Sequence, residues 1–412
     1  MRWKARRTPC GIVCLLVVAA GSYGADWRQW GGPSSNFHVA TTGIADKWPE
    51  SGPKQLWKRA LGPGYSSIMA DAGKLYTMYR DGDDEVVVAL DAATGKTLWE
   101  YKYAAPVGKA YTRDFGLGPN ASPLILEDRI ITIGFTAKMN CISLDGKPLW
   151  SHDLLADFRG ESLKFGYAAS PILYNGHVIV LVGGKENGVI AFKPADGSIA
   201  WRSEPCDINY VTPSVINVDG QDQLVVFSKT EVLGLDANGG KRLWSFPCTN
   251  KYETHVTGAI WGDDNLLWVS TQKNGSTRVV KLTQAGGKTS VEQVWENKKI
   301  NVFHWNSIRI GDYVYTSIGG TITTTAAVNV KTGKIAWRER GFTKMLCLYA
   351  DNKLILLDET GQLALARVSP EGFEVLSKVQ LTEKVSWTVP TLVGRTLYVR
   401  DAKNILALDL GE

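Results

Sequence analysis

The chain has few of the residues that most often carry catalysis: five histidines and six cysteines in 412 residues. It contains no HExxH, GxSxG or CxxC motif, so the sequence signals of zinc proteases, serine hydrolases of the nucleophile-elbow type and dithiol oxidoreductases are absent, although an unrelated hydrolytic activity stays open. TGKT at 94–97 has Leu90 where a phosphate loop requires glycine, and DGDDE at 81–85 lacks the alternating ligands of a calcium loop. Both are interpreted as hairpin turns, and we expect no metal site.

Long apolar runs are also absent, except for one near the N-terminus. MRWKARR is followed by GIVCLLVVAA and by small residues up to Gly24, so residues 1–24 are predicted to be a secretory signal peptide. The apolar run is too short to span a bilayer. Cleavage after Gly24 removes four basic residues and lowers the formal net charge from +5 to +1. We expect an exported protein, periplasmic or secreted, with no transmembrane segment after cleavage and no nucleic-acid partner.

A short signal recurs along the rest of the chain: a strand that ends near Asp, a glycine turn, and a strand that ends in Trp. ALDAATGKTLWEY is the clearest copy, and RVSPEGFEVL is a degenerate copy with Leu376 in the Trp position. Such a period indicates stacked supersecondary units. The tryptophans are predicted to cover the gap to the next unit and are Trp57, Trp99, Trp150, Trp201, Trp244, Trp295 and Trp337.

Each period holds four short apolar runs separated by turn residues, which is the composition of a propeller blade. The sequence predicts an all-β, eight-bladed β-propeller of four-stranded antiparallel blades over residues 54–412. Residues 25–53 form an irregular segment that we expect to lie across the outside. The last repeat has three strands and the front has one, so the N-terminal strand around Trp57 should complete the C-terminal blade and remove its open edges.

Four cysteines follow Gly24. Cys141 and Cys347 lie inside apolar strands and are predicted to be buried. Cys206 and Cys248 come just after the Trp-bearing strands of neighbouring repeats. A disulfide between them and a pair of free thiols are both open alternatives.

The first strand of each blade lines the central channel, so the residues that precede it should ring one channel mouth. Two long loops, Tyr103–Pro119 and Leu154–Tyr167, are the segments that could wall such a site. A mouth of aromatic, amide, imidazole and ammonium groups would suit a small molecule, although the rings could also simply plug the channel. The candidate ligand-binding residues are Tyr65, Asn120, Tyr210, His255, His304, Trp305, Lys344 and Trp387.

The repeat ending LDaaTGkxxW, the segment DWRQWGGP and the blade starts ASP and TPS resemble the pyrroloquinoline quinone (PQQ)-like repeat family over Asp26–Glu412. This resemblance implies an eight-bladed propeller of an exported bacterial type. The family includes quinoprotein alcohol dehydrogenases and a scaffold lipoprotein of the outer-membrane barrel-assembly machine. The dehydrogenases carry adjacent cysteines against the quinone and a calcium ion held by Glu and Asn. This chain has no adjacent cysteines, and no position matches those ligands.

Two functions are therefore considered. The first is an exported, non-catalytic propeller, expected to be a monomer without a cofactor, that binds a protein partner or a small molecule at the mouth. The alternative is a PQQ- and calcium-dependent quinoprotein dehydrogenase of alcohols or sugars. PQQ carries three carboxylates, yet Lys344 is the only cation in the predicted ring, so we expect weak or no PQQ binding.

Overall fold

The structure is a computed structural model that describes residues 26–412 except 273–274, 303–305, 321, 384 and 412. The predicted signal peptide and its cleavage site lie outside the described residues, as do His304 and Trp305. The described residues form strands and turns, and no helix among them is long and apolar enough to cross a membrane.

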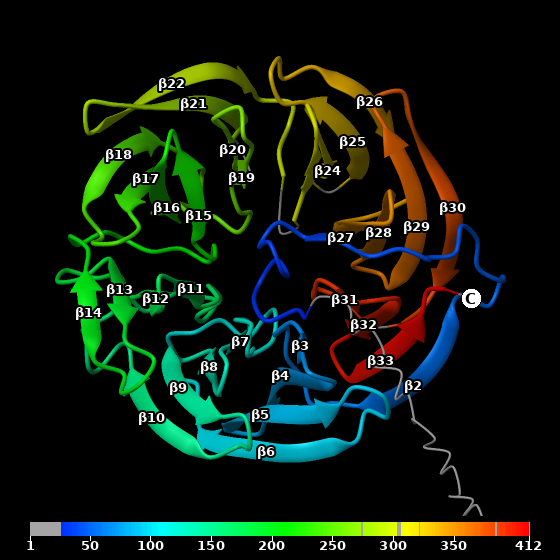
Figure 1. Cartoon of the computed structure of the whole chain (residues 1–412), viewed down its shortest axis with the longest axis horizontal. Coiled ribbons are helices and arrows are strands. Elements are labelled where there is room, and N and C mark those ends of the chain that lie inside the picture. The colour runs from blue at the N-terminus through cyan, green and yellow to red at the C-terminus, as the bar shows by residue number, and fades with distance from the viewer. Residues whose placement is uncertain (1–25, 273–274, 303–305, 321, 384, 412) are drawn as a thin grey trace, which may run out of the picture.

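Eight sheets surround a central axis, which confirms the predicted eight-bladed all-β propeller (Figure 1). Each blade runs antiparallel from an inner to an outer strand, and its middle strands are almost completely buried. Blades 1 to 4 are β3(Met69–Asp71) β4(Lys74–Asp81) β5(Asp84–Asp91) β6(Thr97–Ala104); β7(Leu124–Ile125) β8(Arg129–Ile133) β9(Lys138–Ser143) β10(Pro148–Asp153); β11(Ile172–Tyr174) β12(His177–Leu181) β13(Val189–Phe192) β14(Ile199–Arg202); β15(Ser214–Val218) β16(Gln221–Phe227) β17(Glu231–Asp236) β18(Arg242–Pro247). Blades 5 to 8 are β19(Ile260–Trp261) β20(Leu266–Ser270) β21(Thr277–Ala285) β22(Lys288–Asn297); β23(Ile308–Ile310) β24(Tyr313–Gly319) β25(Thr323–Asn329) β26(Ile335–Glu339); β27(Met345–Ala350) β28(Lys353–Asp358) β29(Gln362–Ser369) β30(Gly372–Gln380); β31(Thr391–Val393) β32(Thr396–Arg400) β33(Asn404–Asp409) β2(Lys54–Ala60).

The predicted closure is confirmed. Strand β2 pairs antiparallel with β33, from Lys54 opposite Asp409 to Ala60 opposite Asn404. The N-terminal strand thus becomes the outer strand of blade 8 and joins the two ends of the chain in one sheet. The hairpin interpretation of 81–85 also holds, because β4 ends at Asp81 and β5 begins at Asp84.

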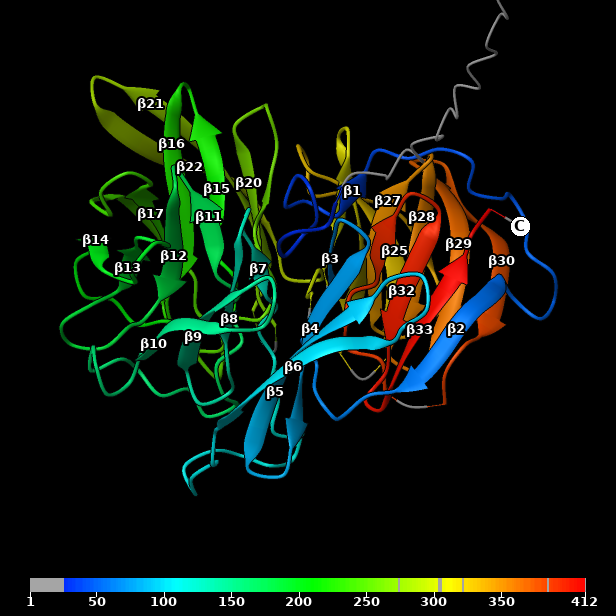
Figure 2. The ribbon, with the colours of Figure 1, turned by 60° about the horizontal axis from the view of Figure 1, so that its bottom comes forward.

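Residues 26–53 do not simply pass along the outside. Trp27 exchanges two backbone hydrogen bonds of 2.9 Å with Ala70 of β3, and β1(His38–Val39) pairs parallel with the inner strand β27. The segment therefore crosses the channel between the inner strands of blades 1 and 7, and only then runs outward to β2 (Figure 1). The side view in Figure 2 shows it on the face opposite the long loop between β6 and β7. Large apolar side chains such as Trp27, which is 2% exposed, explain why it lies over the core.

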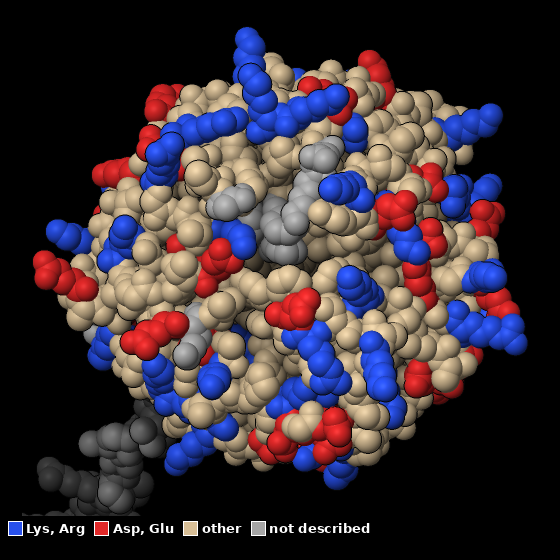
Figure 3. Space-filling view, turned by 180° about the vertical axis from the view of Figure 1, so that it is seen from behind, with Lys and Arg blue, Asp and Glu red and all other residues tan. Residues whose placement is uncertain are grey.

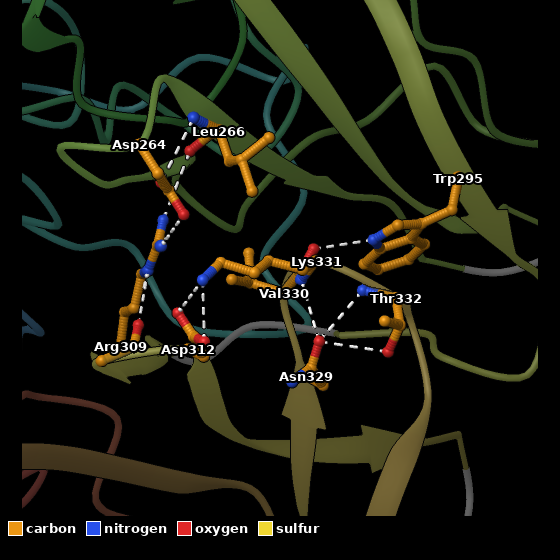
Figure 4. A network of polar contacts seen from close by, with 10 residues as sticks. Asp264, Leu266, Trp295, Arg309, Asp312, Asn329, Val330, Lys331 and Thr332 are labelled. Carbon is orange, nitrogen blue, oxygen red and sulfur yellow. Dashed lines mark hydrogen bonds and ion pairs between the residues drawn. The ribbon is translucent and has the colours of Figure 1, made fainter.

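The repeated tryptophans link neighbouring blades as expected. The indole N–H of Trp99 donates to the carbonyl of Leu144 (2.9 Å), and that of Trp295 donates to the carbonyl of Val330 (2.7 Å; Figure 4). The rings of Trp99 and Trp295 also cover the turn glycine of the next blade, so that a Cβ on Gly146 would lie 2.8 Å from the Trp99 ring. The repeat needs glycine for this close approach as well as for its positive φ of 89°.

Trp244 makes a different polar contact. Its indole N–H donates to Gln223 Oε1 in the same blade (2.6 Å), and Gln223 Nε2 donates to Thr289 of blade 5 (2.7 Å). Blade 5 ends in the long β21–β22 hairpin instead of a short TGK-type turn, and its Gly286 and Gly287 have no ring above them. Trp244 packs among apolar residues of blades 4 and 5, so it joins the two blades through Gln223 and apolar contacts.

Leu376 does not occupy the tryptophan position of blade 7, so the prediction that placed it there is wrong. The β-bulge in this hairpin places Ser377 opposite Leu365, as Trp99 lies opposite Ala89 in blade 1. The N-terminal segment fills the gap, because buried Trp48 donates its backbone N–H to Ser377 Oγ (2.8 Å). Ala45 N–H donates to the carbonyl of Leu410 (2.8 Å), the position in blade 8 that corresponds to the indole acceptor Ala92 in blade 1.

Replacement of Trp99 by Ala is expected to destabilise the protein by about 2–3 kcal/mol. Full burial would imply roughly 3–5 kcal/mol, but the Trp99 ring is partly exposed, so less apolar area is lost. Urea unfolding measures the effect, with Trp99→Phe as the variant that keeps most of the ring contact but loses the indole N–H. An unchanged unfolding midpoint for Trp99→Ala would show that the interblade packing interpretation is wrong.

Candidate functional site at the channel mouth

The channel mouth lies on the face that carries the crossovers into the inner strands, opposite residues 26–40. Figure 3 shows that this face is hollowed near its centre. Tyr65, Tyr210 and Trp387 each precede an inner strand, which is the column position predicted from the sequence. In a propeller this position is set by the ring symmetry, so residues from distant repeats converge.

Five aromatic side chains form a continuous arc around this mouth. The ring centroids are 5.3 Å apart for Trp387 and Tyr65, 6.2 Å for Trp387 and Phe115, 5.8 Å for Phe115 and Phe165, and 5.7 Å for Phe165 and Tyr210. We call these five residues the aromatic arc. It extends from blade 8 to the start of blade 4, and Phe115 is 51% exposed within it.

Phe115 and Phe165 were not among the predicted site residues. They lie in the two loops that the sequence analysis identified as possible walls, and each is followed by a glycine with positive φ, Gly116 at 86° and Gly166 at 76°. The repeated Phe-Gly pair in the two crossovers is the sequence signal that could have identified them.

Hydrogen bonds fix the two phenylalanine loops to the predicted column. Tyr65 Oη donates to the carbonyl of Phe115 (2.8 Å), and the Phe165 N–H donates to Tyr210 Oη (3.3 Å). Asn120 Nδ2 donates to the carbonyl of Phe165 (3.2 Å). Burial raises the pKa of both tyrosines, so they remain neutral hydroxyls at physiological pH.

A buried ion pair holds the Phe115 loop from below. Arg80 Nη2 bonds Glu85 Oε1 (2.9 Å), and the same guanidinium donates to the carbonyls of Leu117 (2.8 Å) and Ala105 (3.0 Å). Glu85, which is 0% exposed, also accepts from Tyr103 Oη (2.7 Å). The carboxylate lies so near the backbone of Gly134 that no Cβ could be added there.

The side chains of Lys344 and Trp387 both contact the carboxylate of Glu359. Lys344 Nζ lies 2.9 Å from Glu359 Oε2, and the Trp387 indole N–H donates to the same oxygen (3.3 Å). Glu359 was not predicted, because it comes from the turn between β28 and β29. The ammonium of Lys344 is therefore already paired with an acid.

His255 lies between blades 4 and 5 and is only 2% exposed. Its backbone N–H donates to Asn209 Oδ1 (2.7 Å), its Nε2 lies 3.2 Å from the carbonyl of Lys229, and its ring packs on Phe227. The structure thus places His255 within the interblade packing and does not present its ring to a ligand. Burial lowers the pKa of its imidazole, so the native protein holds it neutral.

Acid is therefore expected to destabilise the protein through His255. A histidine whose pKa is lower in the folded state binds fewer protons than the unfolded chain, so stability falls as the pH drops below about 6.5. His38, whose pKa is also lowered by burial, adds to this effect. The melting temperature of His255→Gln should depend less on pH between about 7.5 and 5 than that of the wild type. An equal pH dependence would contradict the assignment.

The four described cysteines are free, so Cys206 and Cys248 do not form a disulfide here. Cys141 and Cys347 are buried, as predicted. Among the residues that the structure describes, no three histidine, cysteine, aspartate or glutamate residues lie close enough together to hold a metal ion.

A family model described as outer membrane protein assembly factor BamB matches residues 49–137 and 83–339, which together are well over half of the chain. The chain belongs to this family of PQQ-like repeat propellers. One curated member, the quinoprotein alcohol dehydrogenase PedH of Pseudomonas putida, is 30% identical over 129 residues. That match covers 30% of this chain and only 20% of the dehydrogenase, so the whole enzyme's activity does not follow from it.

Solved structures of two kinds share the propeller fold. A quinohemoprotein alcohol dehydrogenase from Pseudomonas putida has a TM-score of 0.67 and 14% identity, over 94% of this chain and 80% of its own. BamB from Moraxella catarrhalis has a TM-score of 0.59 and 13% identity, over 86% of this chain and 99% of its own. At these identities, the PQQ-like repeat family supplies the fold, and the site must indicate the function.

Proposed function

We propose that this protein is an exported, non-catalytic propeller that binds a partner protein through the aromatic arc. The observation that carries the proposal is the arc itself: five rings in contact across several blades, with Phe115 half exposed and held in place by Tyr65. Rigid aromatic side chains are the commonest anchors of protein interfaces, because they bury a large area at a small cost in conformational entropy.

The comparisons support this proposal without specifying the partner. The family description names an outer membrane protein assembly factor, and BamB shares the fold over nearly its whole length. The family description and the BamB structure both favour a protein-binding role for an exported protein. The partner expected for the arc presents an apolar or aromatic segment, because the arc offers ring faces with one paired acid, Glu359, and one exposed cation, Lys164, over the Phe165 ring.

The alternative, a PQQ-dependent dehydrogenase, is favoured by the partial match to PedH. The mouth residues do not fit a tricarboxylate, however. Lys344 is paired with Glu359, and Lys229 is paired with Glu161 at 2.5 Å. Arg400 is 1% exposed, and its guanidinium donates to Thr77 Oγ1 and to three backbone carbonyls. Because these cations already have partners, we derive no catalytic step through PQQ.

Site-specific photocrosslinking in the native host tests the binding proposal. A photoreactive phenylalanine analogue at Phe115 should yield one reproducible crosslinked protein. The same analogue at Leu98, which is 48% exposed on outer strand β6, should not yield it. Tyr65→Ala should lower the crosslinking yield at position 115, because the Phe115 loop loses its anchor. Equal products at positions 115 and 98, or none at either, would contradict the proposal.

Titration with PQQ and Ca²⁺ separates the two functions. We expect no change in the PQQ absorbance spectrum and no dye reduction with alcohols. A stoichiometric complex tighter than roughly micromolar, worth about 8 kcal/mol, would favour the dehydrogenase, especially if Trp387→Ala weakened it.

A further inference from the structure

A basic surface lies on the mouth face, on the half of the ring opposite the aromatic arc. Lys298 and Lys299 follow β22 of blade 5, Arg338 lies near the end of β26 in blade 6 and Arg340 just beyond it, and all four side chains are exposed. Arg338 Nη2 lies 3.5 Å from the carbonyl oxygen of Lys299, which brings the two groups together. Figure 3 shows Lys and Arg gathered along the upper edge of this face. We call these four cations, with Ile322, the basic patch.

The positive charge of the basic patch is not balanced by ion pairs. Among the described residues, none of the four cations lies within ion-pair distance of a carboxylate. The nearby Glu296 accepts a hydrogen bond from Ser276 Oγ (2.6 Å) and pairs with Arg278 (3.0 Å), and Lys298 also helps to lower its pKa. Exposed Glu339 lies between Arg338 and Arg340 in the sequence, so four cations face one further carboxylate. On the arc side of the mouth, Lys229 and Lys344 each have an acidic partner, whereas Lys164 is exposed and its Nζ lies 5.7 Å from the centre of the Phe165 ring. The basic patch therefore presents net positive charge to anything that approaches it.

An apolar side chain protrudes beside these cations. Ile322 is 75% exposed, more than any other large apolar side chain described. It lies in the turn between β24 and β25 at the same end of blade 6 as Arg338, since Thr325 pairs with Glu339. Tyr252, 52% exposed and with its ring centroid 5.7 Å from the Lys251 ammonium, lies in the crossover between blades 4 and 5 and extends the pattern toward blade 4. Exposed apolar residues among lysines and arginines are typical of surfaces that bind anionic lipid.

We propose that the basic patch binds the anionic surface of a lipid bilayer. Ile322 would enter the headgroup region, and Lys298, Lys299, Arg338 and Arg340 would contact lipid phosphates. A bilayer is favoured over an acidic protein because Ile322 is 75% exposed in a turn beside the cations, and an exposed apolar side chain gains by entering the headgroup region. The aromatic arc lies on the other half of this face. A propeller that contacts the bilayer through blades 5 and 6 alone therefore leaves the arc accessible, and the two proposals are independent.

Flotation with vesicles tests this inference. The protein should bind vesicles of phosphatidylcholine and phosphatidylglycerol, should bind phosphatidylcholine alone much more weakly, and should dissociate at high salt. Lys298→Ala with Lys299→Ala should weaken binding about thirtyfold, because each lost cation near an anionic surface corresponds to roughly a fivefold change. Ile322→Asn should weaken binding, whereas Ile322→Phe should preserve it.

A matched control lies on the opposite face of the same two blades. Lys288 and Lys334 are exposed in the outer turns of blades 5 and 6, so Lys288→Ala with Lys334→Ala makes the same charge change. This control should bind vesicles like the wild type. All variants have the same N-terminal residues, so any vesicle binding by those residues is equal in all of them. Three results would overturn the inference: equal binding to both vesicles, equal loss in the control pair, or salt-sensitive binding to polyglutamate or RNA without vesicle binding.

Discussion

Deletion of residues 26–61 is expected to abolish the monomeric fold and to give an aggregating protein. The deletion removes β2 and leaves the backbone groups of β33 unpaired along a sheet edge. It also removes Trp57, whose indole N–H bonds the carbonyl of Ala92 (2.9 Å), and buried Trp48, which fills the gap between blades 7 and 8. Two interblade contacts and two strands, β1 and β2, are therefore lost together.

Size-exclusion chromatography with light scattering measures this effect. The control is a permuted chain in which a short turn joins the end of β33 to residues 54–61, which restores blade 8 without the segment over the channel. That variant should be monomeric but should melt below the wild type, because it still lacks Trp48 and Trp27. A deletion variant that stays monomeric with unchanged melting would contradict the closure.

Replacement of Glu85 by Ala is expected to cost about 3–5 kcal/mol. The change leaves the buried Arg80 guanidinium without its carboxylate, and the penalty for an unpaired buried charge is large. The double variant Arg80→Leu with Glu85→Leu should be less destabilised than Glu85→Ala, because no buried charge remains. Urea unfolding curves of the wild type, of Glu85→Ala and of the double variant measure these differences in the free energy of unfolding.

The same pair links stability to the site. Arg80 holds the loop through Leu117 and Ala105, so its loss should also lower crosslinking from position 115. A double variant as unstable as Glu85→Ala would mean that packing, and not the unpaired charge, sets the penalty. Unchanged crosslinking in both variants would mean that the Phe115 loop does not depend on Arg80.

The fold could be predicted because its signals are local and repeated. A turn glycine followed by Trp marks the outer hairpins of blades 1 to 4 and 6, and the unequal strand count at the two chain ends indicates how the ring closes. The place of Ser377 could not be predicted from the glycine spacing, because the hairpin of blade 7 is longer. Eight residues, 367–374, separate Ala366 from its partner Val375, whereas six residues, 91–96, separate Leu90 from Thr97 in blade 1, and the bulge beside the tryptophan position is the same in both. The role of Trp48 was equally hidden, since its partner Ser377 comes from the far end of the sequence.

The site was predictable only in part. Symmetry brings Tyr65, Tyr210 and Trp387 to one mouth, and their sequence position reveals this. The environment of each side chain depends on partners from other repeats: Glu359 pairs with Lys344, and Asn209 with the carbonyl of Lys229 encloses His255. The spacing of residues in a single sequence does not predict those contacts. Phe115 and Phe165 could not be aligned with the other site residues, because they come from loops of unequal length.

The pairing of β2 with β33 also constrains the order in which the molecule can form. Synthesis proceeds from the N-terminus, so β2 is made long before its partner β33, which lies at the other end of the chain. Contacts between such distant residues form slowly, and until then the apolar face of β2 and residues 26–53 have no surface to cover. We therefore expect the nascent chain to carry an unpaired β2 and an unburied Trp48 until its last two blades are complete, and to be prone to aggregation in that interval.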